Sequence, residues 1–239
     1  MPVPLLDKMK EWDYTSSWEC KQPTVTPVDW MLSCRCISQL FRKEYGLSVH
    51  HSQAAYMVLS QILRFYPYCE KKDMISYACA ASCIAVKLFE HNEEAYPDWS
   101  REVRERFGVE NIEHTTWERY LDMLQNLIGA TKKEVITAAD FMPLAAQHLA
   151  WTERRSREVS YHIELAASVM GIYTSATPNV LAAGALMSGL SDTEKRIVYD
   201  AAVSDWDVEY CEAFMMCTLI ESASGFDPFY KKLYLEEEQ

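Results

Sequence analysis

Hydrophobic and polar positions along this chain of 239 residues follow mainly the period of an α-helix. No long stretch alternates polar and apolar residues at period two, and the chain holds only 7 glycines and 9 prolines to interrupt helices. The pattern predicts about ten helices in two sets of five. We therefore expect an all-α protein.

Caps and prolines indicate where several of these helices begin. Pro27 suits the first turn of a helix, and Asp29 suits its positive N-terminal end. Thr137 is expected to cap a helix in which Pro143 either lies in the first turns or produces a kink. Thr152 is expected to cap the helix that follows.

Two of the predicted helices are built around small side chains. The stretch "MISYACAASCIAVKLFEHN", residues 74–92, is apolar on most sides, and its centre is almost all Ala, Cys and Ser. Its "AASC" at 80–83 has a counterpart in "AAGA" at 182–185, and each lies in the third helix of its set. Small side chains allow neighbouring helices to approach closely. We predict two repeats, each packed around a central helix of this kind.

Composition restricts the classes of partner. Hydrophobic residues make up 49% of the chain, which is enough for a large core. The net charge of -12 disfavours nucleic acid and anionic membranes as direct partners. The sequence contains no apolar run long enough for a membrane span, and acidic residues interrupt its N-terminus where a signal peptide would be apolar. We expect an intracellular protein.

Motifs for catalysis and for metal binding are missing from the sequence. The eight cysteines show no short repeated spacing, so reduced thiols are expected instead of a zinc site. There is no glycine-rich phosphate loop, HExxH or GxSxG motif. The adjacent His50 and His51 lie on different faces of a helix. We expect no metal, no cofactor and no enzymatic activity.

Several segments match, in their order along the chain, the helices of one known family. "AAYMVLSQILRF" and "YACAASCIAVKLFE" are similar to the second and third helices of a first cyclin box, and "TAADFMPLAAQHL" and "SATPNVLAAGALMSGL" are similar to helices of a second one. "EVITAADF" and "GFDPF" are similar to segments of gammaherpesvirus cyclins. From roughly residue 28 to 225 the chain resembles the cyclin family, especially its D-type members and their viral relatives.

This resemblance implies a domain organisation and a function. The organisation is an N-terminal segment with a short helix (1–26), two tandem five-helix cyclin boxes (27–131 and 132–227) and an acidic C-terminal tail (228–239). The function is that of a non-catalytic regulatory subunit, which binds and activates a cyclin-dependent protein kinase and promotes cell-cycle progression. Its location would be the nucleus, the cytoplasm or both.

The resemblance also assigns residues to kinase binding. In cyclins, a lysine at the end of the third helix and an acidic residue on the fifth helix bind the kinase backbone. Those positions are Lys87 and Asp122 here, with Glu118 one turn earlier as a substitute, and charge-assisted hydrogen bonds of this kind are strong. An apolar surface is expected around them, formed by Leu88, Phe89 and Leu124. The alternative is that Lys87 only complements the negative end of its helix.

The family's substrate-docking patch is degenerate in this sequence. Small side chains replace aliphatic ones on the first helix, and the third helix lacks the glutamine that binds a substrate backbone. We therefore do not expect ordinary Arg-x-Leu kinase substrates to bind here. The patch positions are Trp30, Ser33, Cys34, Ile37, Met74 and Ile75.

Two other classes of function remain open at this point. One is a cyclin-fold adaptor, which binds other proteins or a transcription complex and activates no kinase, because one fold serves many functions. The other is a helical enzyme with a site between the repeats. Dependence of kinase binding on Lys87 would distinguish the regulatory subunit from both.

Overall fold

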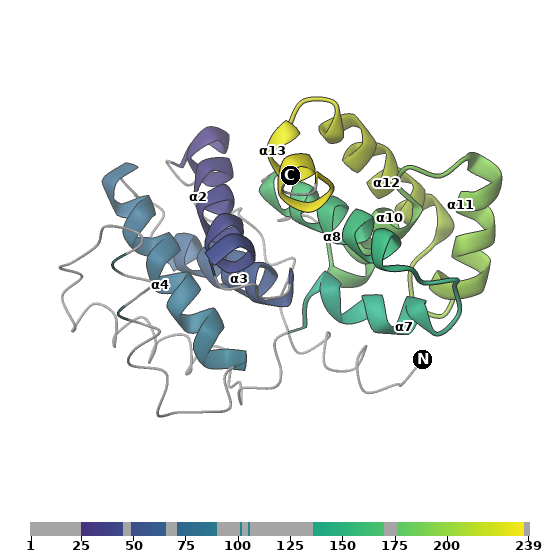
Figure 1. Ribbon diagram of the computed structural model, residues 1–239, viewed down its shortest axis with the longest axis horizontal. Helices are drawn as coiled ribbons and strands as arrows, with labels where there is room; N and C mark the ends of the chain where they lie inside the picture. The colour runs from purple at the N-terminus through teal and green to yellow at the C-terminus, as the bar shows by residue number, and fades with distance from the viewer. Residues whose placement is uncertain are drawn as a thin grey trace. The chain divides into compact units, whose positions relative to one another are not determined.

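The computed structural model describes residues 25–44, 49–65, 71–89, 101, 105, 136–169 and 176–236. These residues form nine α-helices and no β-strand (Figure 1). The expectation of an all-α fold is confirmed for this part of the chain. None of the helices in these ranges is long and apolar enough to cross a membrane.

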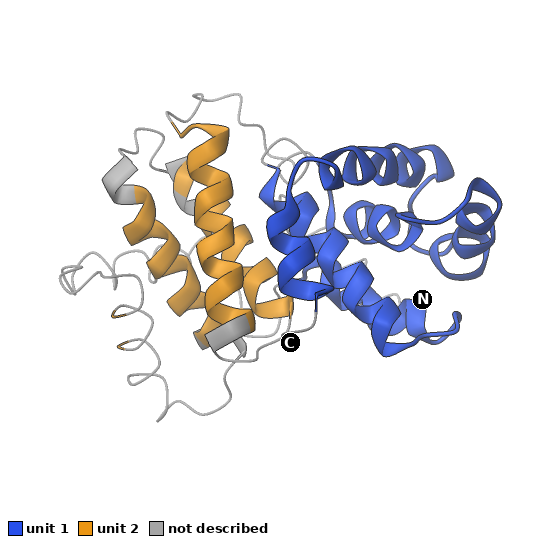
Figure 2. Cartoon of the chain, turned by 45° about the horizontal axis from the view of Figure 1, so that its top comes forward, with its two compact units in different colours: residues 1–15, 136–239 blue, residues 16–135 orange. Residues whose placement is uncertain are grey.

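The chain divides into two compact units, which Figure 2 colours separately. Unit 2 comprises Ser16–Val135, and unit 1 comprises Ile136–Gln239 together with Met1–Thr15. The assignment of these units to two cyclin boxes stays a prediction.

The described part of unit 2 contains three α-helices. They are α2 (Pro27–Gln39), which continues as a π-helical segment η2 (Leu40–Glu44), α3 (Val49–Phe65) and α4 (Lys71–Phe89). The start of α2 is as predicted, because the hydroxyl of Thr26 accepts a hydrogen bond from the Asp29 N–H at 3.1 Å and Pro27 occupies the first turn.

The small side chains of α4 form the interior of unit 2. All residues from 78 to 86 are buried, and α4 packs against both α2 and α3. The one hydroxyl in this stretch, that of Ser82, donates to the Ala78 carbonyl at 2.8 Å, so its burial leaves no unmade hydrogen bond. The prediction of a central helix with small side chains is confirmed for the part of unit 2 that the structure describes.

A buried polar contact joins α2 to α3. The carbonyl of Cys34 accepts hydrogen bonds from the hydroxyl groups of Ser38 at 3.0 Å and Tyr56 at 3.1 Å. Trp30 and Ile37 are fully buried on the same helix. This polar contact fixes the register between the two helices, because a shift would leave buried hydroxyl groups without partners.

Unit 1 contains six α-helices among its described residues. They are α7 (Met142–Ala146), α8 (Glu153–Ser168), α10 (Pro178–Met187), α11 (Asp192–Val198), α12 (Tyr210–Ser224) and α13 (Pro228–Tyr234), with a 3-10 turn η3 (Ala138–Phe141) before α7 and a π-helical segment η4 (Tyr199–Val203) after α11.

The helix predicted after Thr137 consists of two pieces. The Asp140 carboxylate accepts hydrogen bonds from the N–H and the hydroxyl of Thr137, at 2.6 and 2.9 Å, and so holds the 3-10 turn. Pro143 then lies in the first turn of α7, where its missing N–H costs no hydrogen bond. Thr152 caps α8 as expected, because its hydroxyl accepts from the Arg155 N–H at 3.1 Å.

The centre of unit 1 is α10, which packs against α8, α11, α12 and η3 (Figure 1). Every residue from 181 to 188 is buried. At Gly184 an added Cβ would lie 2.7 Å from the Cβ of Met216, closer still to its Cγ, and 3.0 Å from the Cys217 nitrogen. A hydrogen atom at this position therefore permits the observed approach of α12 to α10.

The last helix, α13, lies in the range that the sequence assigned to an acidic tail, and it was not predicted. Asp227 caps it by accepting the Phe229 N–H at 2.9 Å, and Pro228 occupies its first turn. The helix packs against α8 and buries Tyr230 and Tyr234, which are spaced four residues apart.

Replacing Gly184 with Ala should destabilise the protein by about 1–3 kcal/mol, because the new methyl group overlaps Met216 and the backbone beyond it. Urea unfolding of the full chain measures the change. Gly225→Ala is the matched control: its added Cβ would meet only the Ser222 carbonyl, at 3.6 Å, so little loss is expected. Equal stability of the two variants would contradict the close approach of α10 and α12.

Candidate functional site

The predicted kinase-binding residues lie at the C-terminal end of α4 and further along the chain. Lys87, Leu88 and Phe89 form the last turn of α4, directly after the buried residues 78–86. Packing of residues 78–86 therefore fixes the position of the backbone of this last turn. The side chains assigned to the kinase-binding site all lie outside the described structure. They are those of Lys87, Leu88 and Phe89, and those of Glu118, Asp122 and Leu124.

The predicted substrate-docking patch lies largely inside unit 2. Five of its positions are buried, and α2 packs against α4 at this place. Ile75 is the exception, with 52% of its surface exposed. In this arrangement a peptide could meet only Ile75. The buried positions are Trp30, Ser33, Cys34, Ile37 and Met74.

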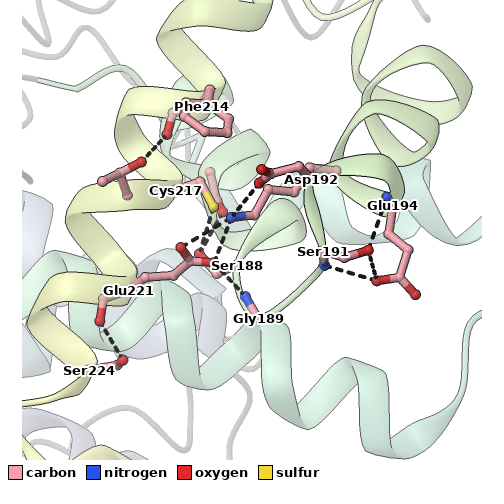
Figure 3. Close-up of polar contacts among 12 residues, drawn as sticks. Ser188, Gly189, Ser191, Asp192, Glu194, Phe214, Cys217, Glu221 and Ser224 are labelled. Atoms are coloured by element: carbon pink, nitrogen blue, oxygen red, sulfur yellow. Dashed lines mark hydrogen bonds and ion pairs between the residues drawn. The ribbon is translucent and has the colours of Figure 1, made fainter.

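A cluster of polar side chains in unit 1, shown in Figure 3, was not predicted. The Lys195 side chain on α11 is only 7% exposed, and its Nζ lies 3.0 and 3.1 Å from the two carboxylate oxygens of Glu221 on α12. Glu221 also accepts the Gly189 N–H at 3.0 Å. Lys195 stands in the polar stretch "SDTEKR", which reads as a solvated helix start, so nothing local indicated its burial.

The ion pair determines the charge state of both side chains. Partial burial opposes ionisation of Glu221, but the hydrogen bonds from Lys195 and Gly189 outweigh it and lower the pKa of the carboxyl. Burial likewise opposes the charge of Lys195, yet its hydrogen bond to Glu221 raises the pKa of the ammonium group overall. Both groups are therefore charged at neutral pH.

Cys217 and Ser188 complete the cluster (Figure 3). The Ser188 hydroxyl donates to the Gly184 carbonyl at 2.8 Å and lies 3.8 Å from the Cys217 sulfur. Burial raises the pKa of the Cys217 thiol, so the thiol is neutral at neutral pH and a weak nucleophile. The cluster therefore joins the end of α10 and the start of α11 to α12.

A half-buried polar side chain, His162 on α8, lies near the end of α10. Burial lowers its pKa to about 4, and the charge of Arg155 adds to this effect, while a hydrogen bond to the Ala185 backbone opposes it. Its Nδ1 is buried without a hydrogen-bond partner. Arg155 itself donates to the Leu186 carbonyl at the end of α10. The imidazole is neutral at pH 7.

The chemistry that these groups offer is structural: a neutral thiol, a neutral imidazole and a closed ion pair. Among the described residues no group of three or more His, Cys, Asp or Glu side chains could hold a metal ion.

Neither a protein-family model nor a curated protein matches the chain. The likeness to cyclins therefore depends on the motifs themselves and stays a prediction.

Replacing Lys195 with Met should destabilise the protein by about 2 kcal/mol at pH 7. The variant loses the hydrogen bonds between the two charged groups, and the Glu221 carboxylate is left beside the apolar Met side chain. The pKa of Glu221 is lowered in the folded state. The contribution of the ion pair to the free energy of unfolding is therefore fully present above the ordinary pKa of 4.5 and is lost as pH falls through the lower folded value. Urea unfolding at several pH values measures both effects.

The matched control is Arg154→Met, which removes an exposed ion pair to Glu158 within one helix. Its effect should stay below about 0.5 kcal/mol. An equal loss in the two variants would contradict a structural role for the Lys195–Glu221 pair.

Replacing His162 with Gln should remove part of the acid sensitivity of the protein. The folded pKa of about 4 lies below the ordinary 6.5, so the unfolded chain takes up a proton first and stability falls as pH decreases from 6.5 to 4. The full difference corresponds to about 3 kcal/mol. The free energy of unfolding of the variant should decline less across this range than that of the wild type, whereas His148→Gln, at an exposed position, should leave the decline unchanged.

Proposed function

We propose that this protein is a regulatory subunit that binds and activates a cyclin-dependent protein kinase through unit 2. The observation that supports this most is the form of α4: its small side chains are buried over residues 78–86, and Lys87 follows at once in the last turn. Unit 1 contains a second buried helix of small residues, α10, as the resemblance to a tandem cyclin implies.

The binding chemistry follows from the position of Lys87. A lysine in the last turn of a helix complements the negative end of the helix dipole, and its ammonium group can donate to backbone carbonyl groups of a partner. Asp122, or Glu118 in its place, accepts N–H groups of the same kinase segment, and Leu88, Phe89 and Leu124 supply apolar contacts around these anchors.

Activation of the kinase would be a shift in population. The subunit binds only the conformation in which the kinase's mobile regulatory helix occupies its active position, so binding favours that conformation. Phosphoryl transfer itself belongs to the kinase.

A second function, a cyclin-fold adaptor that activates no kinase, is favoured by the docking patch. Trp30, Cys34 and Ile37 are fully buried, so the patch offers little surface for a kinase substrate. Other apolar side chains of unit 2, Val28 and Leu32 on α2, are exposed one turn apart and could contact a different protein. Kinase binding without activation would indicate this function.

The test is a pull-down of purified cyclin-dependent kinases with the full chain, followed by a phosphorylation assay. Lys87→Glu should weaken binding of the responsive kinase by about 30-fold or more and abolish activation, because a donor to the kinase backbone becomes a repelling acceptor. Lys72→Glu makes the same charge change in the first turn of α4 and should leave both readouts intact.

Three results would count against the regulatory subunit. Failure to bind any kinase would exclude it, and so would binding that Lys87→Glu leaves unchanged. Binding that depends on Lys87 but gives no activation would favour the adaptor.

A further inference from the structure

The outer face of α12 carries exposed apolar side chains in a regular row. Met215 is 62% exposed, Leu219 49% and Phe226 89%. Met215 and Leu219 are one helical turn apart and share a face. Gly225 keeps a right-handed helical conformation, with φ −72° and ψ −17°, and the Phe226 N–H donates to the Ala223 carbonyl at 3.0 Å. The chain thus closes α12 with a hydrogen-bonded turn, and Phe226 lies two residues beyond the end of the helix. We call these three exposed residues the α12 stripe.

The hydroxyl groups on this side of α12 are bonded to the helix itself. The Thr218 hydroxyl donates to the Phe214 carbonyl at 3.0 Å, and the Ser222 hydroxyl donates to the Thr218 carbonyl at 2.8 Å. Their donors are satisfied without solvent or a partner, so the surface between the three apolar side chains is less polar than its sequence indicates.

The stripe is not required for packing of α12 within unit 1. The opposite side of the helix buries Ala213, Met216, Cys217 and Ile220, and α12 packs with this side against α10 and α8. A surface helix needs only one apolar face for its own core. A second apolar face, left exposed, is typical of an interaction site.

The charges around α12 indicate which kind of partner would bind the stripe. Residues 197–230 contain no Lys or Arg. Four exposed acidic side chains lie just before α12 or in its first turn, and none forms an ion pair with any residue that the structure describes. One of these carboxylates, that of Glu212, accepts the Glu209 N–H at 3.1 Å. The Arg196 guanidinium lies over the Tyr210 ring, but no basic side chain among the described residues pairs with the four. The start of α12 therefore carries a net negative charge. The four residues, which we call the acidic end, are Asp205, Asp207, Glu209 and Glu212.

We propose that the α12 stripe docks an amphipathic helix of a partner protein, with an apolar row on one face and Lys or Arg at one end. The stripe spans residues 215–226, and its helical part, residues 215–224, is about 14 Å long, which matches two to three turns of a partner helix. The apolar row packs on Met215, Leu219 and Phe226, and the basic end pairs with the acidic end. This docking concerns α12 alone and does not depend on kinase binding by unit 2.

The experiment measures binding of a labelled helical peptide to the full chain by fluorescence anisotropy. The probe carries Leu at positions i, i+4 and i+7 and Lys at one end. One comparison peptide has Glu in place of Lys, and another has Ser in place of Leu. The Lys/Leu peptide should bind at least about tenfold more tightly than either, because each comparison removes one half of the complementarity.

Substitutions in the stripe separate docking from general electrostatic attraction. Met215→Asp and Leu219→Asp should each weaken binding at least about tenfold through loss of an apolar anchor. Both add negative charge, so attraction of a basic peptide to an acidic protein alone would become stronger. Ile197→Asp, at an apolar position of α11 that is 60% exposed, is the matched control and should not weaken binding.

The acidic end is tested with Asp205→Asn and Asp207→Asn combined. This variant should bind the basic peptide about threefold less tightly at low salt, with a smaller difference at high salt. Both positions are exposed, so these substitutions should leave the fold intact. This variant therefore still tests the proposal if a stripe variant has an altered circular dichroism spectrum or melting temperature.

Other results would overturn the proposal. Unchanged or tighter binding by both stripe variants would mean that charge alone attracts the peptide. Equal binding of the Glu-containing peptide would exclude a basic partner. A wild-type chain that forms dimers, which Leu219→Asp dissociates, would mean that a second copy of the protein covers the stripe.

Discussion

Close approach of helices around small side chains is the constraint on which each unit depends. In unit 1 the position of α12 requires Gly184, because a Cβ there would overlap Met216. With α12 in this place, Glu221 reaches both Gly189 at the end of α10 and Lys195 on α11. The ion pair therefore stabilises an arrangement that the absence of one side chain permits. In unit 2 the buried residues 78–86 of α4 have the same role between α2 and α3.

This packing gives the proposed function a physical basis. A helix that is held on several sides presents its last turn at a fixed place, so a partner meets Lys87 in a preorganised position and less conformational entropy is lost on binding. The exposed side chains of α12 likewise belong to a helix whose opposite face is buried against α10 and α8. Both proposed contacts thus use the ends or outer faces of helices whose inner faces are fixed by packing.

Local signals in the sequence predicted much of the fold. Pro27 with Asp29, and Thr152, predicted helix starts, and the Ala-rich segments predicted the two buried helices. Long-range contacts had no such signal. Lys195 and Glu221 are far apart in the sequence, and each looks like an ordinary surface charge until α11 and α12 are packed. The short helix α13 was missed because acidic residues follow it and only two tyrosines indicate its buried face.

The predicted site was accessible to sequence analysis only through motifs, which align positions but do not give burial. Trp30 and Ile37 matched a docking patch, yet both face the interior of unit 2, because the helix period alone cannot distinguish a core row from a binding row. The most direct measurement is hydrogen exchange of the full chain alone and with an added cyclin-dependent kinase. We predict slower exchange in the last turn of α4, residues 86–89. Unchanged exchange there, with or without protection elsewhere, would contradict kinase binding through this helix.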